Sequence, residues 1–372
     1  MFKFDFSVYQ ESKQFFQLYD VIIKKEPINK DAFLNDLGIT PSSYRRCRNY
    51  KQNIGNKIID ILNNHYGYKK CDDKFIKQIE DELSKIYYDM YYKNYESYQV
   101  QLDYLNDLLK ERYCIFPIIE LFKLFMIINS PKSASKIIKE YKEEYKDLMK
   151  YKSFFTDELI MVFDIIELSF EEEISSTILN KSYQNGLCYF VLSSRLTVLG
   201  KHIESLYYAD KARIIFEKEC NYVRLLYLNL TTMFNYNSLK DYNRCYELAH
   251  SQLLALKSLS LFSFEYKNTL KHMVVALLGL KKYNNVLALL SEIDVYTYTE
   301  LACLYVAKYY VNKKMYKSEI DKAIEENLEN DKLVEFLKSL DLYLSSNEKG
   351  CISKLKNYNL YGGLLDIIND CK

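Results

Sequence analysis

The feature that most constrains the fold is a pair of amphipathic helices predicted over residues 186–219. Apolar residues recur at gaps of three and four positions on both sides of a turn at Gly200 and Lys201, so each helix presents one apolar face. Neither helix buries that face alone, and the pair must therefore stack on neighbouring helices. The spacing residues are Leu187, Phe190, Val191, Leu196, Leu199, Leu206, Ala209, Ala212, Ile215 and Phe216.

The same hairpin recurs three more times towards the C-terminus. Each copy has a turn residue followed two positions later by His or Tyr, and successive turns are separated by 40, 41 and 33 residues. A helical hairpin that repeats in this way is the signature of an α-solenoid. The four pairs are Gly200/His202, Lys240/Tyr242, Lys281/Tyr283 and Lys314/Tyr316.

The first hairpin resembles the tetratricopeptide repeat (TPR). Gly200 stands where that family has its turn glycine, and small residues occupy the small positions of both helices. The later copies depart from the family, because Cys245 and Val286 occupy the small second-helix position and the terminal proline is missing. The resemblance implies a divergent, TPR-like array. The other matching positions are Tyr189, Leu192, Ser193, Leu196, Ser205 and Ala212.

Composition agrees with an all-α chain. Only nine Gly and four Pro interrupt 372 residues, which favours long helices joined by short polar connections. Three further helix pairs are predicted before the first hairpin, over 74–94 with 96–112, 114–129 with 133–150, and 156–170 with 171–183. Helices are also predicted over 331–345 and 361–370, after the last hairpin.

Targeting and thiol patterns favour a cytoplasmic protein without a membrane helix. The longest mostly apolar run, 118–128, is interrupted by Glu120 and Lys123 and is shorter than the ~20 residues that a bilayer span needs. The first ten residues lack the features of a signal peptide. The nine Cys are odd in number and form no CxxC, so we expect reduced, partly buried thiols.

Charge is concentrated at the N-terminus. Residues 1–70 hold 12 Lys/Arg and 7 Asp/Glu, a balance of +5, whereas the remainder of the chain carries −4. A basic end on an acidic body indicates a polyanionic partner for the N-terminal part alone.

The basic segment contains a candidate helix-turn-helix. A first helix is predicted over 8–25, a second over 30–37 capped by Asn29, and a third over 42–49 after a turn at Gly38; a further helix covers 53–65. The stretch FLNDLGITPSSYRRCRN resembles the DNA-binding motif of bacterial repressors, whose second helix enters the major groove. The residues carried over to the reading helix are Ser42, Ser43, Tyr44, Arg45, Arg46 and Arg48.

Two interpretations of this segment remain open. At ~100° per residue Arg45 and Arg48 share a face of the helix and Arg46 points elsewhere. Arginine suits bidentate contacts with guanine and clamping of phosphate, which favours DNA binding. The alternative is that residues 30–65 are the helical hairpin that caps the solenoid.

The sequence contains no recognisable catalytic constellation, so we expect neither an enzyme, nor a cofactor, nor a metal site. The four His lie apart from Cys or acidic residues at ligand spacing, and no P-loop, GxGxxG or HExxH occurs. The remaining candidate is a peptide site on the concave face, which the first helices of TPR-like repeats line. The resemblance places Phe190, Ser194, Thr197, Tyr227, Phe234, Asn237, Asn268 and Lys271 there, with Asn229 and Asn235 as neighbours if the register differs by one residue.

A helix-turn-helix at 1–70 followed by a TPR-like array at 71–372 resembles the peptide-sensing regulators of Gram-positive bacteria and their phages. These include the quorum-sensing transcription factors of the Rgg/PlcR/PrgX type and the arbitrium receptor. The resemblance implies a homodimer that binds a double-stranded DNA operator under the control of a short signalling peptide. The alternatives are a response-regulator phosphatase or inhibitor of the same superfamily, and a TPR scaffold that does not bind DNA.

Overall fold

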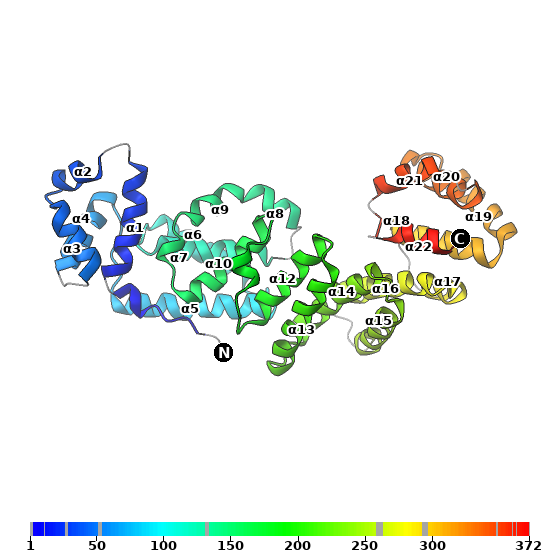
Figure 1. The fold of residues 1–372 in the computed structure, drawn as a ribbon, viewed down its shortest axis with the longest axis horizontal. Coiled ribbons are helices and arrows are strands. Elements are labelled where there is room, and N and C mark those ends of the chain that lie inside the picture. The colour runs from blue at the N-terminus through cyan, green and yellow to red at the C-terminus, as the bar shows by residue number, and fades with distance from the viewer. Residues whose placement is uncertain are drawn as a thin grey trace. The chain divides into compact units, whose positions relative to one another are not determined.

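A computed structural model of the chain describes residues 3–10, 12–26, 29–50, 54–130, 134–257, 263–291, 297–346, 349–358, 360–361 and 363–371. Within these ranges the regular elements are helices, accompanied by one isolated bridge between Lys69 and Tyr113 (Figure 1). The prediction of an all-α chain built from many packed helices is therefore confirmed. None of the described helices combines the length and the apolar character that a bilayer-spanning helix requires.

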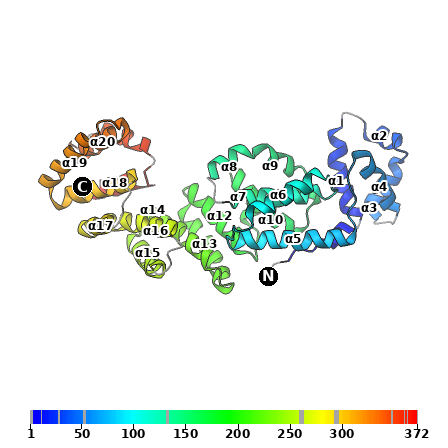
Figure 2. The same cartoon turned by 180° about the vertical axis from the view of Figure 1, so that it is seen from behind.

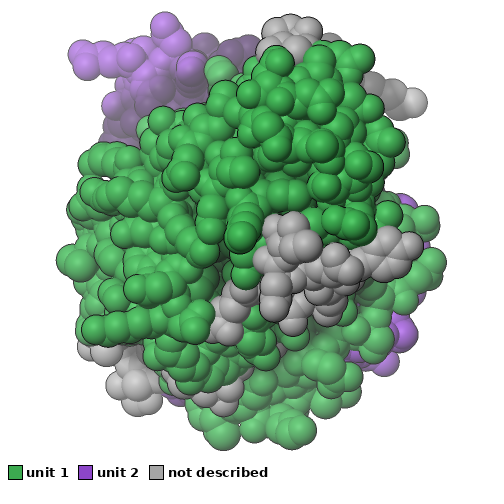
Figure 3. Space-filling view, turned by 90° about the vertical axis from the view of Figure 1, so that its left-hand side faces the viewer, with its two compact units in different colours: residues 1–195, 214–224 green, residues 196–213, 225–372 purple. Residues whose placement is uncertain are grey.

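The chain divides into two compact units, coloured separately in Figure 3. Unit 1 comprises residues 1–195 and 214–224, and unit 2 comprises residues 196–213 and 225–372. The division differs from the boundary predicted after residue 70, because the first helices belong to the same unit as the helices that follow them.

Unit 1 begins with a 3₁₀ helix and a group of four α-helices, and continues as a succession of packed helices (Figures 1 and 2). The bounds are η1 (Ser7–Gln10), α1 (Ser12–Lys25), α2 (Lys30–Asp36), α3 (Pro41–Tyr50), α4 (Ile54–Tyr66), α5 (Asp73–Tyr91), α6 (Tyr98–Lys110), α7 (Phe116–Ile128), α8 (Ala134–Glu140), α9 (Lys142–Met149), η2 (Lys152–Phe154), α10 (Asp157–Phe170) and α11 (Ser176–Leu179). Helix α1 packs on α3 and α4, and also on η1 and η2.

Aromatic residues at the N-terminus join the first helices to the rest of unit 1. The buried ring of Phe4 lies 5.5 Å from that of Tyr87 on α5 and 5.0 Å from that of Phe122 on α7, both edge-on. The hydroxyl of buried Tyr9 donates a 2.7 Å hydrogen bond to the carbonyl of Phe154. Burying aromatic surface stabilises such a junction by about 1.5–3 kcal/mol per side chain, so the first 70 residues are anchored to the following helices.

The predicted hairpins form with bounds close to those expected from the sequence. Three of them share a turn in which the second residue after the first helix is left-handed: Gly200 at φ +74°, Lys240 at φ +61° and Lys281 at φ +60°. The hydrogen bonds of a Schellman motif close each turn, as in Lys201 N to Leu196 O at 2.9 Å. The paired helices are α12 (Gly186–Val198) with α13 (His202–Lys218), α14 (Tyr222–Ser238) with α15 (Tyr242–Leu256), and α16 (Ser263–Gly279) with α17 (Tyr283–Leu290).

The small second-helix positions are packing positions. Ser205, Cys245 and Val286 each lie five residues after a turn residue, and each is fully buried. Close packing also requires a glycine in α16, because a Cβ on Gly279 would lie 2.6 Å from the ring of Tyr242. The fourth hairpin, α18 (Tyr298–Val311) with α19 (Lys313–Glu326), has no left-handed residue at its turn, and Asn312 instead caps α19 through its side chain.

Two helix predictions in unit 1 are wrong. The helix predicted over 171–183 is reduced to α11, because α10 ends at Phe170 and Glu171 is extended. Three consecutive glutamates are unfavourable at the negative end of the α10 dipole. The single helix predicted over 133–150 is divided into α8 and α9 at Tyr141.

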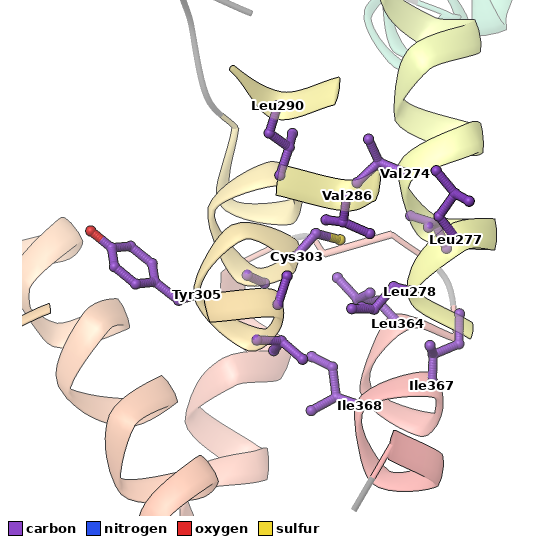
Figure 4. Close-up of a cluster of buried hydrophobic side chains, with 14 of the residues drawn as sticks. Val274, Leu277, Leu278, Val286, Leu290, Cys303, Tyr305, Leu364, Ile367 and Ile368 are labelled. Carbon is purple, nitrogen blue, oxygen red and sulfur yellow. The ribbon is translucent and has the colours of Figure 1, made fainter. Parts of the chain in front are cut away.

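Unit 2 ends with helices that return to the last hairpins. They are α20 (Asp331–Ser346), α21 (Lys349–Leu355), the 3₁₀ helix η4 (Lys356–Tyr358) and α22 (Leu364–Cys371). Helix α22 packs on α16, and Figure 4 shows its Leu364, Ile367 and Ile368 turned towards the buried cluster around Leu278 and Cys303. The C-terminus therefore completes the core that α16 to α18 begin.

Candidate functional site

The candidate DNA-binding element consists of α2, a four-residue turn and α3. The side-chain oxygen of Asn29 accepts hydrogen bonds from the backbone N–H groups of Asp31 and Ala32, which begins α2 as predicted. Gly38 then takes a left-handed conformation at φ +72°, and the N–H of Ile39 donates to the carbonyl of Leu34 at 2.8 Å. This Schellman closure stops α2 and turns the chain into α3.

The orientation of α3 follows from two buried residues. Tyr44 and Cys47 are fully buried, one turn apart on the face towards α1 and α4. The predicted DNA contact at Tyr44 therefore needs correction: its ring packs edge-on against Phe16 at 5.1 Å, so it is a core residue. Ser42, Arg45, Arg46 and Arg48 of α3 are exposed to solvent, and Ser43 is half-buried.

Asp20 on α1 holds this arrangement together, and sequence reasoning missed it. Its carboxylate accepts a 2.9 Å hydrogen bond from the hydroxyl of Tyr44 and forms ion pairs with Arg48, at 2.9 Å, and Lys30. The Asp20 side chain is only 13% exposed, so these bonds are partly shielded from water. The signal in the sequence was a lone acid on the otherwise apolar face of α1, which shares that face with Phe16 and Ile23.

The arginines of α3 differ in their partners. Nη2 of Arg45 donates to both carboxylate oxygens of Asp31 on α2, at 2.7 and 3.1 Å, and both side chains are largely exposed. Exposed pairs of this kind contribute only about 0–1 kcal/mol, so a phosphate can replace the carboxylate at small cost. Arg46 is exposed and has no ion pair with any carboxylate in the described ranges.

Several residues predicted to contact a peptide instead join neighbouring helices. The hydroxyl of Thr197 on α12 donates to Asn235 Oδ1 on α14 at 3.1 Å and lies 2.8 Å from the hydroxyl of Ser205. His202 Nδ1 lies 2.8 Å from the same Asn235 oxygen. Asn235 is fully buried, so this neighbouring position of the prediction belongs to the hairpin core.

Asn237 and Asn229 also serve internal contacts. The amide of buried Asn237 donates to the carbonyl of His272 at 3.0 Å and to the hydroxyl of Tyr361 at 3.2 Å. Asn229 donates to Gln252 at 2.8 Å, and Gln252 donates to Thr269 at the same distance. The Oδ1 atoms of Asn229 and Asn237 are buried without a hydrogen-bond partner in the described structure.

The other predicted positions are half-buried and do not converge on one site. Phe190 and Ser194 belong to unit 1, where the guanidinium of Arg224 lies 5.7 Å from the Phe190 ring centre. Phe234 packs on Tyr361 with ring centres 4.9 Å apart. Asn268 donates to the carbonyl of Phe264 within its own helix; Tyr227 is half-buried on α14.

Lys271, another predicted residue, lines a cavity. The cavity lies in unit 2 and has a volume of about 540 Å³. Its walls combine two lysines, one glutamate and two tyrosines with smaller polar side chains, a mixture that suits a polar ligand with an aromatic part. The lining residues are Lys271, Thr297, Tyr298, Thr299, Lys332, Glu335, Asn357 and Tyr358.

Comparison of the chain with protein-family models, curated proteins and solved structures found no match. In the described part of the chain, no group of three or more His, Cys, Asp or Glu side chains is arranged to hold a metal ion. The α2–α3 element and the unit 2 cavity are the sites that bear on the predicted DNA and peptide contacts.

Proposed function

We propose that this chain is a DNA-binding transcription regulator that acts as a homodimer and responds to a short peptide. The observation that carries the proposal is the α2–turn–α3 element, in which Gly38 sets the turn and Tyr44 anchors α3 from below. This anchoring leaves Ser42, Arg45 and Arg46 on the solvent side of the helix. A helix held in this way suits insertion into a major groove.

Electrostatics supports a phosphate-dependent mode of binding. Arg45 and Arg48 are held by Asp31 and Asp20 at 2.7 and 2.9 Å, so their guanidinium groups are ordered before DNA arrives. Arg46 is free to reach a phosphate or a guanine edge. Each phosphate contact should contribute roughly 0.9 to the slope of log affinity against log salt concentration.

The experiment is a mobility-shift selection from sheared genomic DNA, followed by titration of the selected fragment. Arg45→Ala, Arg46→Ala and Arg48→Ala should each weaken binding about 5- to 150-fold, equivalent to ~1–3 kcal/mol. Arg244→Ala is the matched control, because Arg244 is an exposed arginine of α15 that pairs with Asp241. Unchanged affinity in all three α3 variants would reject α3 as the reading helix.

The unit 2 cavity supports the peptide part of the proposal. Lys271 and Lys332 supply positive charge beside Glu335, so the cavity offers partners for both a carboxylate and an amine of a peptide. We expect pools of short random peptides to yield binders by calorimetry, with Lys271→Ala weakening them and exposed Lys314→Ala acting as the control. A bound peptide should change operator affinity by about 1–3 kcal/mol; binders that leave it unchanged would refute the switch.

One observation favours a second candidate, a helical-repeat scaffold without DNA binding. The N-terminal residues Phe4, Phe6 and Tyr9 are buried against α5, α7 and η2, as expected for helices that cap an array. In that case no genomic fragment would be selected, and affinity capture with the intact chain would yield proteins only.

A further inference from the structure

Two cysteines far apart in the sequence lie side by side in unit 1. Cys71 precedes α5 and Cys114 precedes α7, and their Sγ atoms are 3.8 Å apart. A short parallel bridge holds the two segments together: Lys69 N donates to Arg112 O at 2.9 Å, and Cys114 N donates to Lys69 O at 3.0 Å. The backbone therefore fixes the approach of the two thiols.

The pair borders a cavity of about 320 Å³ in the same unit. Cys114 is buried, whereas Cys71 is partly exposed, and both line the cavity beside Lys70 and Asp72. A small oxidant such as hydrogen peroxide therefore has room to reach the sulfur atoms. By contrast, Cys47, Cys188 and Cys245 are buried single thiols, and Cys220 is exposed on the surface.

The two thiols have different acid–base character. The hydrogen bond between the two thiols, aided by backbone N–H groups, lowers the pKa of Cys114, while the same contact and burial raise the pKa of Cys71. A thiolate at Cys114 is thus stabilised by its neighbour, and thiolates are the reactive form of cysteine.

We propose that Cys71 and Cys114 are an oxidative modification site, at which a peroxide converts the two thiols into an intramolecular disulfide. The Cys114 thiolate attacks one peroxide oxygen, the O–O bond breaks, and the released hydroxide takes a proton to become water. Cys114 is then a sulfenic acid. Cys71 loses its proton, its sulfur attacks Cys114 Sγ, the S–O bond breaks, and a second water leaves.

The sulfur atoms must approach from 3.8 Å to a bond length of about 2.05 Å. The partly exposed side chain of Cys71 supplies this movement. The new bond would join the start of α5 to the start of α7 and close a loop across α5 and α6. This inference does not depend on DNA or peptide binding.

The test uses the full-length reduced chain treated with hydrogen peroxide, alkylated, and digested without reductant. Trypsin cleavage after Lys70, Lys74, Arg112 and Lys123 places the two cysteines in separate peptides, 71–74 and 113–123, with one cysteine each. We expect these peptides to appear as one linked species that dithiothreitol separates. Recovery of both peptides singly alkylated, under conditions that oxidise Cys220, would overturn the proposal.

Two variants sharpen the result. Cys71→Ser should abolish the linked species and leave a Cys114 sulfenic acid that dimedone traps, whereas Cys220→Ser should retain the 71–114 link. Absence of dimedone labelling at Cys114 in Cys71→Ser would remove Cys114 as the thiol that attacks the peroxide and would count against the mechanism. Peptide mapping of the chain without substitutions needs neither variant. A folding defect in one variant therefore leaves the test decisive.

Discussion

Acidification should selectively weaken unit 2 through His272. This residue lies on α16 and is 8% exposed, with its Nδ1 2.7 Å from the hydroxyl of Tyr361 and its carbonyl bonded to Asn237. Burial, with a smaller effect of Lys271, lowers the pKa of His272 from 6.5 to about 3. Between pH 3 and pH 6.5, His272 is therefore protonated in the unfolded chain and neutral in the folded chain.

The sign and the size of the effect follow from linkage. Because the folded pKa lies below the unfolded one, the stability contribution is complete above pH 6.5 and is lost as the pH falls towards 3. Each pH unit in this window changes the free energy of unfolding by about 1.4 kcal/mol. Lowering the pH from 7 to 5 should thus reduce the free energy of unfolding by about 2 kcal/mol.

Hydrogen exchange of α16 amides at pH 7, 6 and 5, corrected for the intrinsic rates, measures this local stability. The comparison is between the unchanged chain and His272→Gln, which keeps a polar side chain but does not titrate. The protection of α16 should decline by about 2 kcal/mol more in the unchanged chain than in the variant. Equal decline in both would refute the reasoning, since the other titrating groups are shared.

Three further comparisons of stability test the burial, packing and ion-pair arguments. Burial raises the pKa of Glu120 from 4.5 to about 7. The contribution of Glu120 to the free energy of unfolding is therefore present below pH 4.5 and lost as the pH rises through 7. In urea unfolding, Glu120→Gln should stabilise the chain by about 1–3 kcal/mol at pH 8 and have little effect at pH 5. Gly279→Ala should destabilise the chain by about 1–2 kcal/mol despite the better helix propensity of alanine, because the new Cβ meets the Tyr242 ring. Gly350→Ala, whose new Cβ has nothing within 4 Å, should instead stabilise the chain by about 0.5–1 kcal/mol. Equal thermal shifts in the two variants would contradict the packing argument. Asp20→Ala should lower the free energy of unfolding by about 1–3 kcal/mol, because Tyr44 loses its hydrogen-bond acceptor. Asp31→Ala, which breaks only the exposed pair with Arg45, should lower it by less than about 1 kcal/mol. The reverse order in denaturant titrations would contradict the central role of Asp20.

Helical periodicity predicted the hairpins well because each helix has to bury a stripe of its surface. The turn residues Gly200, Lys240 and Lys281 occur where the sequence placed them, and the small positions are buried. The helix prediction was wrong after Phe170, where local charge outweighed the apolar periodicity. The prediction for Tyr44 was wrong because its side chain faces the core and not the solvent. The short helix α21 was not foreseen.

The candidate site was less predictable than the fold. The exposed arginines of α3 follow from spacing once Tyr44 is known to face inwards, but their pairing with Asp20 and Asp31 depends on helices that lie elsewhere in the sequence. The predicted asparagines illustrate the same limit. A buried amide and a ligand-binding amide look alike in sequence, and Asn237 is distinguished by its burial and its contacts with His272 and Tyr361.

The buried amides of α14 also give the first three hairpins fixed neighbours, because they bond to α13 and to α16. Apolar faces alone are interchangeable between repeats, so a hairpin could stack on the wrong partner during folding at little cost. Asn235 requires the hydroxyl of Ser205, and Asn237 requires the carbonyl of His272. A misordered stack would strand both amides in an apolar interior, each at a cost of about 1–3 kcal/mol. These asparagines therefore favour the stack in which α14 contacts both α13 and α16.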